Sequence, residues 1–212
     1  MWRSSLTKPF IKICGITRRE DLLSAVEGGS DAIGFIAYPK SPRYVSPQKV
    51  RELLKDCPPQ IKKVVVVVNA DLEVINEYLS VGIDVVQLHG SEDAAFAEEI
   101  KVETWKAIRL HEKSQIAEFA DFPCQLFVVD SFVKDSQIPG GTGHSGDWAL
   151  AAEFAKVAGA PVLLAGGIKK TNALEALEQV PCYGLDLSSG VEISPGIKSA
   201  VKIQEFFEVL NS

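Results

Sequence analysis

Cys14 ends a short β-branched segment, FIKIC (10–14), and is followed at once by a glycine. A cysteine at such a place is most often a small apolar core residue. A thiolate is also a base and a nucleophile, so Cys14 becomes a candidate for catalysis if other reactive side chains end their strands at the same place. The chemistry of this chain therefore depends on what its other β-branched segments deliver.

Asp130 ends the segment QLFVVD (125–130), with Leu126 and Val128 on its face at the period-two spacing of a strand. A carboxyl group above an apolar strand face is partly desolvated and suits a general acid near neutral pH. The alternative is an aspartate that caps a helix or anchors a loop. If the fold brings Cys14 and Asp130 to opposite sides of one ligand, the pair predicts an acid and a base in an isomerase layout.

Glycine-rich loops follow the last two β-branched segments. Gly166 and Gly167 lie in LLAGGIKK, and Ser189 and Gly190 lie in LDLSSGVE. Glycines let backbone N–H groups approach an anion, and a helix N-terminus adds partial positive charge, so the two loops together predict a phosphate site. For either loop alone, glycines that serve only a tight turn are the alternative. No such pair follows the segment KKVVVVV (62–68), which favours a ligand with one phosphate rather than two.

A β-branched run, a polar or glycine-rich break and a stretch of helical spacing recur eight times along the chain. Strands that alternate with helices predict right-handed crossovers and a parallel sheet. Eight units in 212 residues make about 26 residues each, which favours one (β/α)8 barrel over residues 1–212, with residues 1–8 as a short extension. The expected strands are 10–14, 31–36, 62–68, 84–89, 104–109, 125–130, 161–165 and 183–188.

A doubly wound sheet is the alternative fold. Its first strand-to-helix turn should carry the pattern G-x-G-x-x-G, and CGITRR does not. In a (β/α)8 barrel the chemistry lies at the carboxyl ends of the strands. Most strands of this chain end in polar residues, which predicts a polar cleft that contains both Cys14 and Asp130.

Composition and charge exclude several classes of partner. The chain is 46% hydrophobic and 24% charged, as expected for a globular core, and its net charge of −6 without a Lys/Arg tract argues against nucleic acid. The longest apolar run, VVVVV (64–68), is far shorter than the roughly 20 residues that cross a bilayer. Four scattered cysteines without a C-x-x-C pair, and an N-terminus without an apolar signal segment, predict a reduced, cytoplasmic protein.

Six motifs occur in order: KICGITRRED, IGFIAYPKSPRYVS, VVQLHG, VVDSF followed by GGTG and DW, LAGGI with a later asparagine, and DLSSGVEISPGIKS. Between about residue 10 and residue 199, they resemble the phosphoribosylanthranilate isomerases, the cofactor-free barrel enzymes of tryptophan biosynthesis. The resemblance implies an Amadori rearrangement of the phosphorylated substrate N-(5-phosphoribosyl)anthranilate to 1-(2-carboxyphenylamino)-1-deoxyribulose 5-phosphate. It implies that the enzyme needs no cofactor and no metal. It also implies that the protein is a monomer or a homodimer.

The resemblance also implies roles for individual residues. It makes Cys14 the general base and Asp130 the general acid. It places the anthranilate carboxylate at Arg43, whose planar fork suits bidentate pairing, and it makes His89 and Asp186 further substrate-binding residues.

Two positions depart from the family pattern. His144 follows GGTG where the family usually has Lys or Arg, and Ser199 stands where Asp is common.

A cysteine is only about 3% ionised at pH 7, so a base at Cys14 needs a neighbouring group that stabilises its thiolate. Lys12, two residues earlier on the same strand face, is expected to favour the thiolate if it points into the barrel.

Other functions on the same fold stay open. Metal-dependent epimerases need clustered His and Asp ligands, whereas the histidines here are His89, His111 and His144. Schiff-base aldolases need a lysine at a strand end, and Lys12 and Lys106 lie inside their expected strands. A non-catalytic phosphate-binding barrel would keep the glycine loops without needing an acid and a base.

Overall fold

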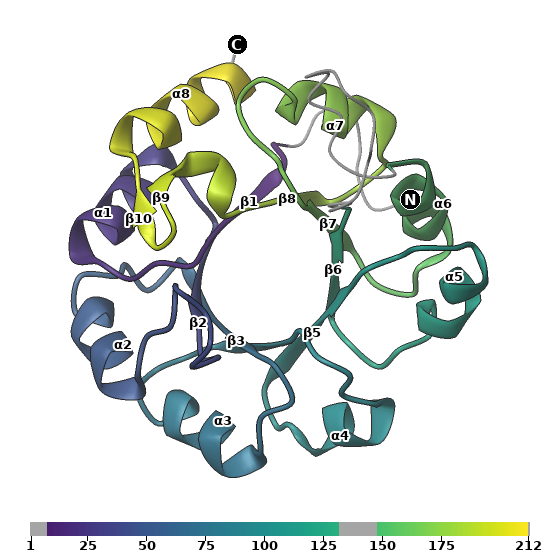
Figure 1. Ribbon diagram of the computed structural model, residues 1–212, viewed down its shortest axis with the longest axis horizontal. Helices are drawn as coiled ribbons and strands as arrows, with labels where there is room; N and C mark the ends of the chain where they lie inside the picture. The colour runs from purple at the N-terminus through teal and green to yellow at the C-terminus, as the bar shows by residue number, and fades with distance from the viewer. Residues whose placement is uncertain (1–7, 132–147, 212) are drawn as a thin grey trace.

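The computed structural model describes residues 8–131 and 148–211, and they form a closed barrel of eight parallel strands in sequence order. Figure 1 shows the ring of strands with the helices around its outside. The predicted (β/α)8 architecture is confirmed, and the doubly wound alternative is wrong. The barrel strands are β1 (Phe10–Cys14), β2 (Ala32–Ile36), β3 (Lys62–Val67), β4 (Val85–Leu88), β5 (Glu103–Ile108), β6 (Leu126–Asp130), β7 (Val162–Ala165) and β8 (Gly184–Leu187).

Capping residues in the sequence define where some of the helices begin and end. At the start of α2, the Ser46 side chain accepts a hydrogen bond from the Lys49 N–H, and Pro47 occupies the first helical position. Gly29 ends α1 in the left-handed conformation with φ 97°. The α-helices are α1 (Arg19–Gly28), α2 (Pro47–Leu54), α3 (Leu72–Leu79), α4 (Ala94–Glu99), α5 (Ser114–Phe119), α6 (Trp148–Val157), α7 (Ala173–Gln179) and α8 (Ala200–Leu210).

Alternation along the strands divides the core into two parts. The outward faces pack against the helices in a large apolar cluster that includes Ile13 on β1 and Leu187 on β8. The inward faces form a smaller cluster that fills the barrel. Its buried members are Ala32, Val64, Val85, Trp105, Ala107, Leu126, Val128, Leu163 and Ala165. Among the buried polar residues of the strands, Lys12 on β1, Gln87 on β4 and Asp186 on β8 share this inward face.

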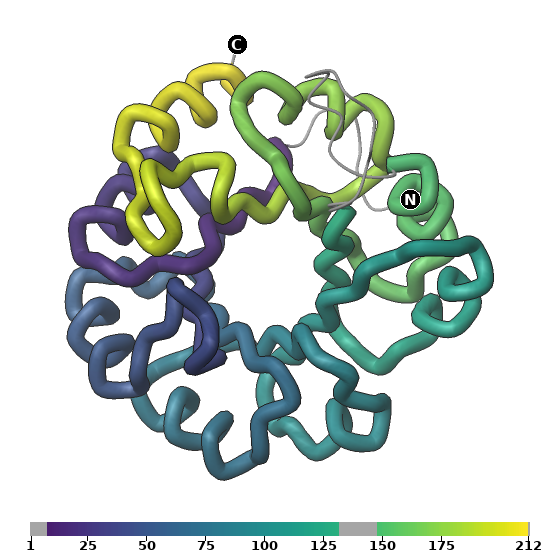
Figure 2. The backbone as a smooth tube through the Cα atoms, in the orientation of Figure 1, coloured from purple at the N-terminus to yellow at the C-terminus, as the bar shows by residue number. Residues whose placement is uncertain are grey.

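β1 pairs with β8 to close the barrel, and this pairing sets Lys12 beside Asp186. After β8 the chain forms a short helical turn, the 3₁₀ helix η1 (Ser189–Val191). The small antiparallel ribbon of β9 (Glu192–Ser194) and β10 (Ile197–Lys198) was not expected from the sequence. Figure 2 shows that α8 then returns beside α1, and the two helices are in contact.

Some sequence predictions are only partly covered by the structure. The strand boundaries agree with the predicted ranges to within one residue. Apart from Lys8, the predicted N-terminal extension lies outside the described residues, and so does His144. No helix in the described part of the chain is long and apolar enough to span a bilayer. No disulfide joins the four cysteines, all of which belong to that part.

Ser199, which departs from the family pattern, is the N-cap of α8. Its side chain accepts a hydrogen bond from the Lys202 N–H, as an aspartate there would. Ser199→Ala should therefore lower the free energy of unfolding by about 1 kcal/mol, whereas Ser199→Asp should preserve it. Urea unfolding of the full chain measures both. Ser24→Ala, which removes a hydroxyl from the interior of α1, is the control, and an equal loss in all three variants would contradict the capping role.

Candidate active site

The carboxyl ends of the strands surround a cavity of about 400 Å³. All nine residues proposed from the sequence as site residues line it, because parallel strands of a barrel end on one rim. The structure therefore brings together the predicted acid, base, substrate-binding and phosphate-binding residues. They are Cys14, Arg43, His89, Asp130, Gly166, Gly167, Asp186, Ser189 and Gly190.

Cys14 ends β1 and is only 7% exposed. Burial raises the pKa of its thiol above the ordinary value, while the nearby Lys12 and Lys198 ammonium groups oppose that rise. Lys12 thus favours the thiolate, as predicted, but burial outweighs it. Gly34 on β2 makes room for the thiol, because a Cβ there would lie 2.7 Å from the Cys14 Sγ.

Lys12 and Asp186 form a buried ion pair inside the barrel. The Lys12 Nζ donates to the Asp186 Oδ2 at 2.8 Å, and the two side chains are 0% and 8% exposed. Burial lowers the pKa of Lys12, but Asp186 and Cys14 outweigh it, and the net shift is upward. A charged, paired amine is a poor Schiff-base nucleophile. The Asp186 Oδ1 is buried without a hydrogen-bond partner among the described residues, which leaves it available to a ligand hydroxyl.

Asp130 ends β6, three strands from β1 around the closed barrel, and lines the cavity from there. Its Oδ2 accepts a hydrogen bond from the Arg109 Nη2 at 2.5 Å. Arg109 follows β5 and is about half exposed, so it approaches from the solvent side of the rim. The contact orients the Asp130 carboxyl group at the cavity wall.

His89 follows β4 and lines the same cavity. Its side chain is exposed at the barrel mouth, although the protein atoms around the mouth remove part of its hydration. This desolvation lowers the pKa of His89, although the Asp130 carboxylate opposes the effect. The shift favours the neutral imidazole, which can both donate and accept a hydrogen bond.

Arg43, predicted to hold a carboxylate, already holds one inside the protein. Its Nε and Nη2 donate to Glu192 Oε1 and Oε2 at 2.8 and 2.6 Å. A ligand carboxylate must therefore use the opposite edge of the guanidinium, which carries Nη1 and the second Nη2 proton. This pairing could not be predicted from local sequence patterns, because Glu192 lies 149 residues away in the chain.

The two glycine loops lie against each other at the cavity. Gly166 and Gly167 have φ values of 88° and 70°, which favour glycine, and in the described residues the Gly167 N–H donates to no backbone carbonyl. Close packing also requires glycine at position 190, since a Cβ there would lie 1.9 Å from the Ile168 carbonyl oxygen. Helix α7 begins only at Ala173, so its N-terminus does not follow the glycine pair directly.

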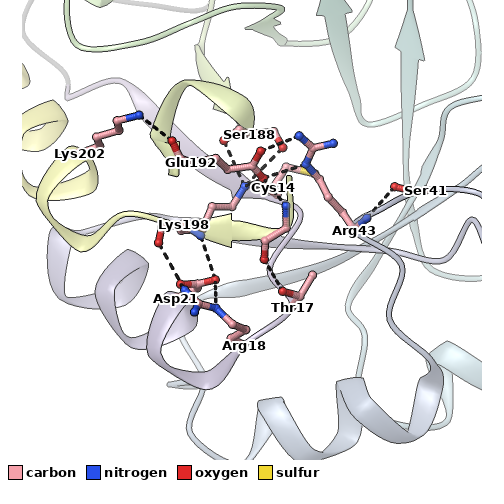
Figure 3. A network of polar contacts seen from close by, with 11 residues as sticks. Cys14, Thr17, Arg18, Asp21, Ser41, Arg43, Ser188, Glu192, Lys198 and Lys202 are labelled. Atoms are coloured by element: carbon pink, nitrogen blue, oxygen red, sulfur yellow. Dashed lines mark hydrogen bonds and ion pairs between the residues drawn. The ribbon is translucent and has the colours of Figure 1, made fainter. Parts of the chain in front are cut away.

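Several residues of the site were missed by sequence reasoning. Gln87 on β4 lines the cavity with its Oε1 buried and without a partner in the described structure. Glu192 and Lys198 form a buried ion pair at 2.9 Å behind Cys14 and Arg43 (Figure 3). Gln87 was detectable, because it shares the inward face with His89 at period-two spacing. No spacing rule pairs Glu192 and Lys198 across the unexpected β9–β10 ribbon.

A second depression, of about 750 Å³, lies beside the first and shares His89 and Arg109 with it. Its wall contains the buried pair Lys106–Glu92 at 3.0 Å. Lys106 also donates to the backbone oxygens of Gly90 and Glu92, so its ammonium is satisfied within the protein. In residues 8–131 and 148–211, no three His, Cys, Asp or Glu side chains gather in a way that would hold a metal ion.

The sequence pattern of one family, described as N-(5'phosphoribosyl)anthranilate (PRA) isomerase, matches residues 11–209. The N-(5'-phosphoribosyl)anthranilate isomerase of Pelobacter propionicus is 40% identical over 200 residues, which cover 94% of each chain. The enzyme of that name from Pseudomonas paraeruginosa is 40% identical over 205 residues and 95% of each chain.

Solved structures agree with these relatives. Phosphoribosyl anthranilate isomerase from Thermus thermophilus has a TM-score of 0.84 at 36% identity, over 95% of this chain and 98% of its own. A phosphoribosyl anthranilate isomerase in complex with reduced 1-(o-carboxyphenylamino)-1-deoxyribulose 5-phosphate has a TM-score of 0.82 at 31% identity, over 96% and 98%. The family pattern, the full-length relatives and the common fold show that this chain belongs to the N-(5'-phosphoribosyl)anthranilate isomerases.

Proposed function

We propose that Cys14 is the general base and Asp130 the general acid of this isomerase, which converts N-(5'-phosphoribosyl)anthranilate to 1-(2-carboxyphenylamino)-1-deoxyribulose 5-phosphate in tryptophan biosynthesis. The observation that carries the proposal is their position on two sides of one cavity that also contains the glycine loops. The rearrangement moves protons within one molecule. An acid and a base are therefore sufficient for it.

The first step belongs to Asp130. It donates a proton to the furanose ring oxygen, the bond between that oxygen and C1 breaks, and the substrate nitrogen supplies the electron pair that forms the protonated Schiff base. Cys14 then removes the proton from C2, and the electrons of that bond form the C1–C2 double bond of an enolamine. Tautomerisation of the enolamine yields the aminoketose.

The remaining site residues would hold the substrate at its ends. The outer edge of Arg43 suits the anthranilate carboxylate, and the unpartnered Asp186 Oδ1 suits a ribose hydroxyl. The neutral form of His89, which its lowered pKa favours, can hydrogen-bond a second hydroxyl. The glycine loops at Gly167 and Ser189 would bind the phosphate through backbone N–H groups.

A non-catalytic phosphate-binding barrel is the competing function, and it differs in one measurable way. It would bind the substrate without forming the aminoketose, whereas the proposed enzyme forms it continuously. Growth of a tryptophan auxotroph that lacks only this isomerase, when it carries this gene, tests the activity in the cell.

We infer further that the enzyme works in the cytoplasm, without nucleic acid or membrane partners, as a monomer or a homodimer. The net charge of −6 supports the exclusion of nucleic acid. One solved relative is described as a dimeric enzyme from Thermotoga maritima from which monomers were generated. Both assembly states are therefore compatible with this fold. Sedimentation of the purified chain decides between them.

Removal of either proposed catalytic group should abolish one proton transfer. Cys14→Ser and Asp130→Asn should each lower kcat by about 10²- to 10⁴-fold with little change in substrate binding. Both changes are nearly isosteric, which limits packing effects. Steady-state kinetics and substrate titration of the inactive variants measure the two quantities. Turnover of Cys14→Ser within about tenfold of the wild type would return Cys14 to the role of a core residue.

The pH dependence should report the buried thiol. The pKa of Cys14 is raised, and the base acts in its ionised form, so kcat/KM of the free enzyme should still be rising above about pH 8.5, where an ordinary cysteine is half ionised. The residual activity of Cys14→Ser should lack this rise. A plateau that begins near neutral pH would contradict the assignment.

The glycine loops should determine the affinity for phosphate. Gly167→Val should raise KM strongly, because it crowds the backbone N–H groups at the cavity. Since φ is 70° at this position, the variant must first be shown to fold by circular dichroism. Gly82→Val, also at positive φ (104°) but far from the cavity, is the control for strain. An unchanged KM and an unchanged inhibition by inorganic phosphate in folded Gly167→Val would place the phosphate elsewhere.

A further inference from the structure

The ammonium group of Lys198 lies directly behind the proposed base. Its Nζ donates to the Cys14 carbonyl oxygen at 2.5 Å, to Glu192 Oε1 at 2.9 Å and to the Ser188 carbonyl oxygen at 3.2 Å. An ammonium has three N–H donors, so these three acceptors satisfy it completely. The lysine side chain is 0% exposed. It thus joins the carboxyl ends of β1 and β8 to the ribbon that follows them.

Glu192 extends this connection to Arg43. Its carboxylate accepts from both Lys198 and Arg43, and it is only 4% exposed (Figure 3). The stem of Arg43 crosses the backbone directly after the cysteine, because a Cβ at Gly15 would lie 2.7 Å from the Arg43 Cδ. The buried Glu192–Lys198 pair therefore binds both the Arg43 guanidinium and the Cys14 carbonyl oxygen. The Arg43 stem also packs against the Gly15 backbone, directly after Cys14.

The surroundings of the ribbon hold Lys198 in place. Its backbone N–H donates to the Asp21 Oδ2 at 3.1 Å, and Asp21 is itself paired with Arg18. The Thr17 hydroxyl donates to the Gly196 carbonyl oxygen between the two short strands. The ribbon is thus fastened to the loop after β1 and to α1, which leaves the Lys198 side chain little freedom.

We propose that Lys198 is a positioning residue for the isomerisation, which sets the Cys14 thiol and the Arg43 guanidinium at a fixed separation. The proposal rests on the roles proposed above for Cys14 and Arg43. The substrate joins its anthranilate carboxylate to the C2 proton through a short covalent path. The carboxylate anchor and the base must therefore match that path, and a displacement of 1 Å can cost about 10²-fold in rate.

Lys198 also contributes charge at the thiol. The charged groups that face Cys14 are Lys12 and Asp186 inside the barrel, and Lys198 and Arg43 behind it. Loss of the Lys198 charge removes one of the groups that oppose the burial effect. The pKa of Cys14 should then rise further. This gives a readout that a purely structural lysine would not change.

The test compares Lys198→Met with Lys202→Met in the full chain. Lys202 is an exposed lysine of α8 that donates to the Glu192 backbone oxygen, so the control removes a lysine from the same region without touching the Glu192 carboxylate. We expect Lys198→Met to lower kcat by about 10²-fold and to raise KM. We also expect it to shift the pH profile of Cys14 alkylation by iodoacetamide to higher pH. Lys202→Met should show none of these changes.

Lys198→Arg gives a second measurement if the methionine variant does not fold. Its guanidinium keeps the charge but cannot direct three donors from one nitrogen at these acceptors. It should therefore retain the wild-type alkylation profile while kcat falls by at least about tenfold. If folded Lys198 variants match Lys202→Met in kcat, KM and alkylation profile, the positioning role is wrong. If Cys14→Ser is fully active, the proposed base is wrong, and the alkylation shift then tests only the effect of the Lys198 charge on the thiol.

Discussion

Charges inside the barrel must be paired, and this constraint explains the arrangement of the mouth. Burial of an ion costs several kcal/mol of hydration free energy, which a partner of opposite charge can offset. Lys12 is paired with Asp186, and Lys198 and Arg43 share Glu192, across separations of 174, 6 and 149 residues in the chain. Because the Lys12–Asp186 and Arg43–Glu192 pairs each join the first quarter of the chain to its last segment, they reinforce the seam where β1 meets β8. The same contacts hold the side chains that face the cavity.

The pairing has a chemical consequence at Cys14. Burial protects the thiol from water but raises its pKa, which reduces the fraction of base at neutral pH. The surrounding ammonium groups oppose this effect without removing it. The site thus combines an apolar floor, which strengthens electrostatic interactions, with fixed cations close to the thiol. A substrate that carries a phosphate and a carboxylate is attracted to such a site even though the whole protein is negatively charged.

Much of the site was predictable because it follows from the geometry of parallel strands. Cys14, His89 and Asp130 were identified as strand ends, and residues at the ends of neighbouring strands must share a rim. Gly167 and Ser189 were identified from the loops that follow the last two strands. Gln87 was missed although it lies two residues before His89 on the same strand face, a spacing from which it could have been identified. The β9–β10 ribbon escaped because strands of two and three residues carry no periodic signal.

The sequence by itself determined which residues form strands and which strand ends are reactive, since period-two apolar patterns and glycine breaks are local properties. The tertiary structure decided the partners of those residues. Nothing local in Arg43 indicates that Glu192 occupies one edge of its guanidinium, and nothing local in Lys198 indicates that it binds the Cys14 carbonyl. It also decided the balance at the thiol, where burial outweighs the neighbouring cations. Ion pairing and desolvation depend on distances between segments that are remote in the chain, and only the closed barrel sets those distances.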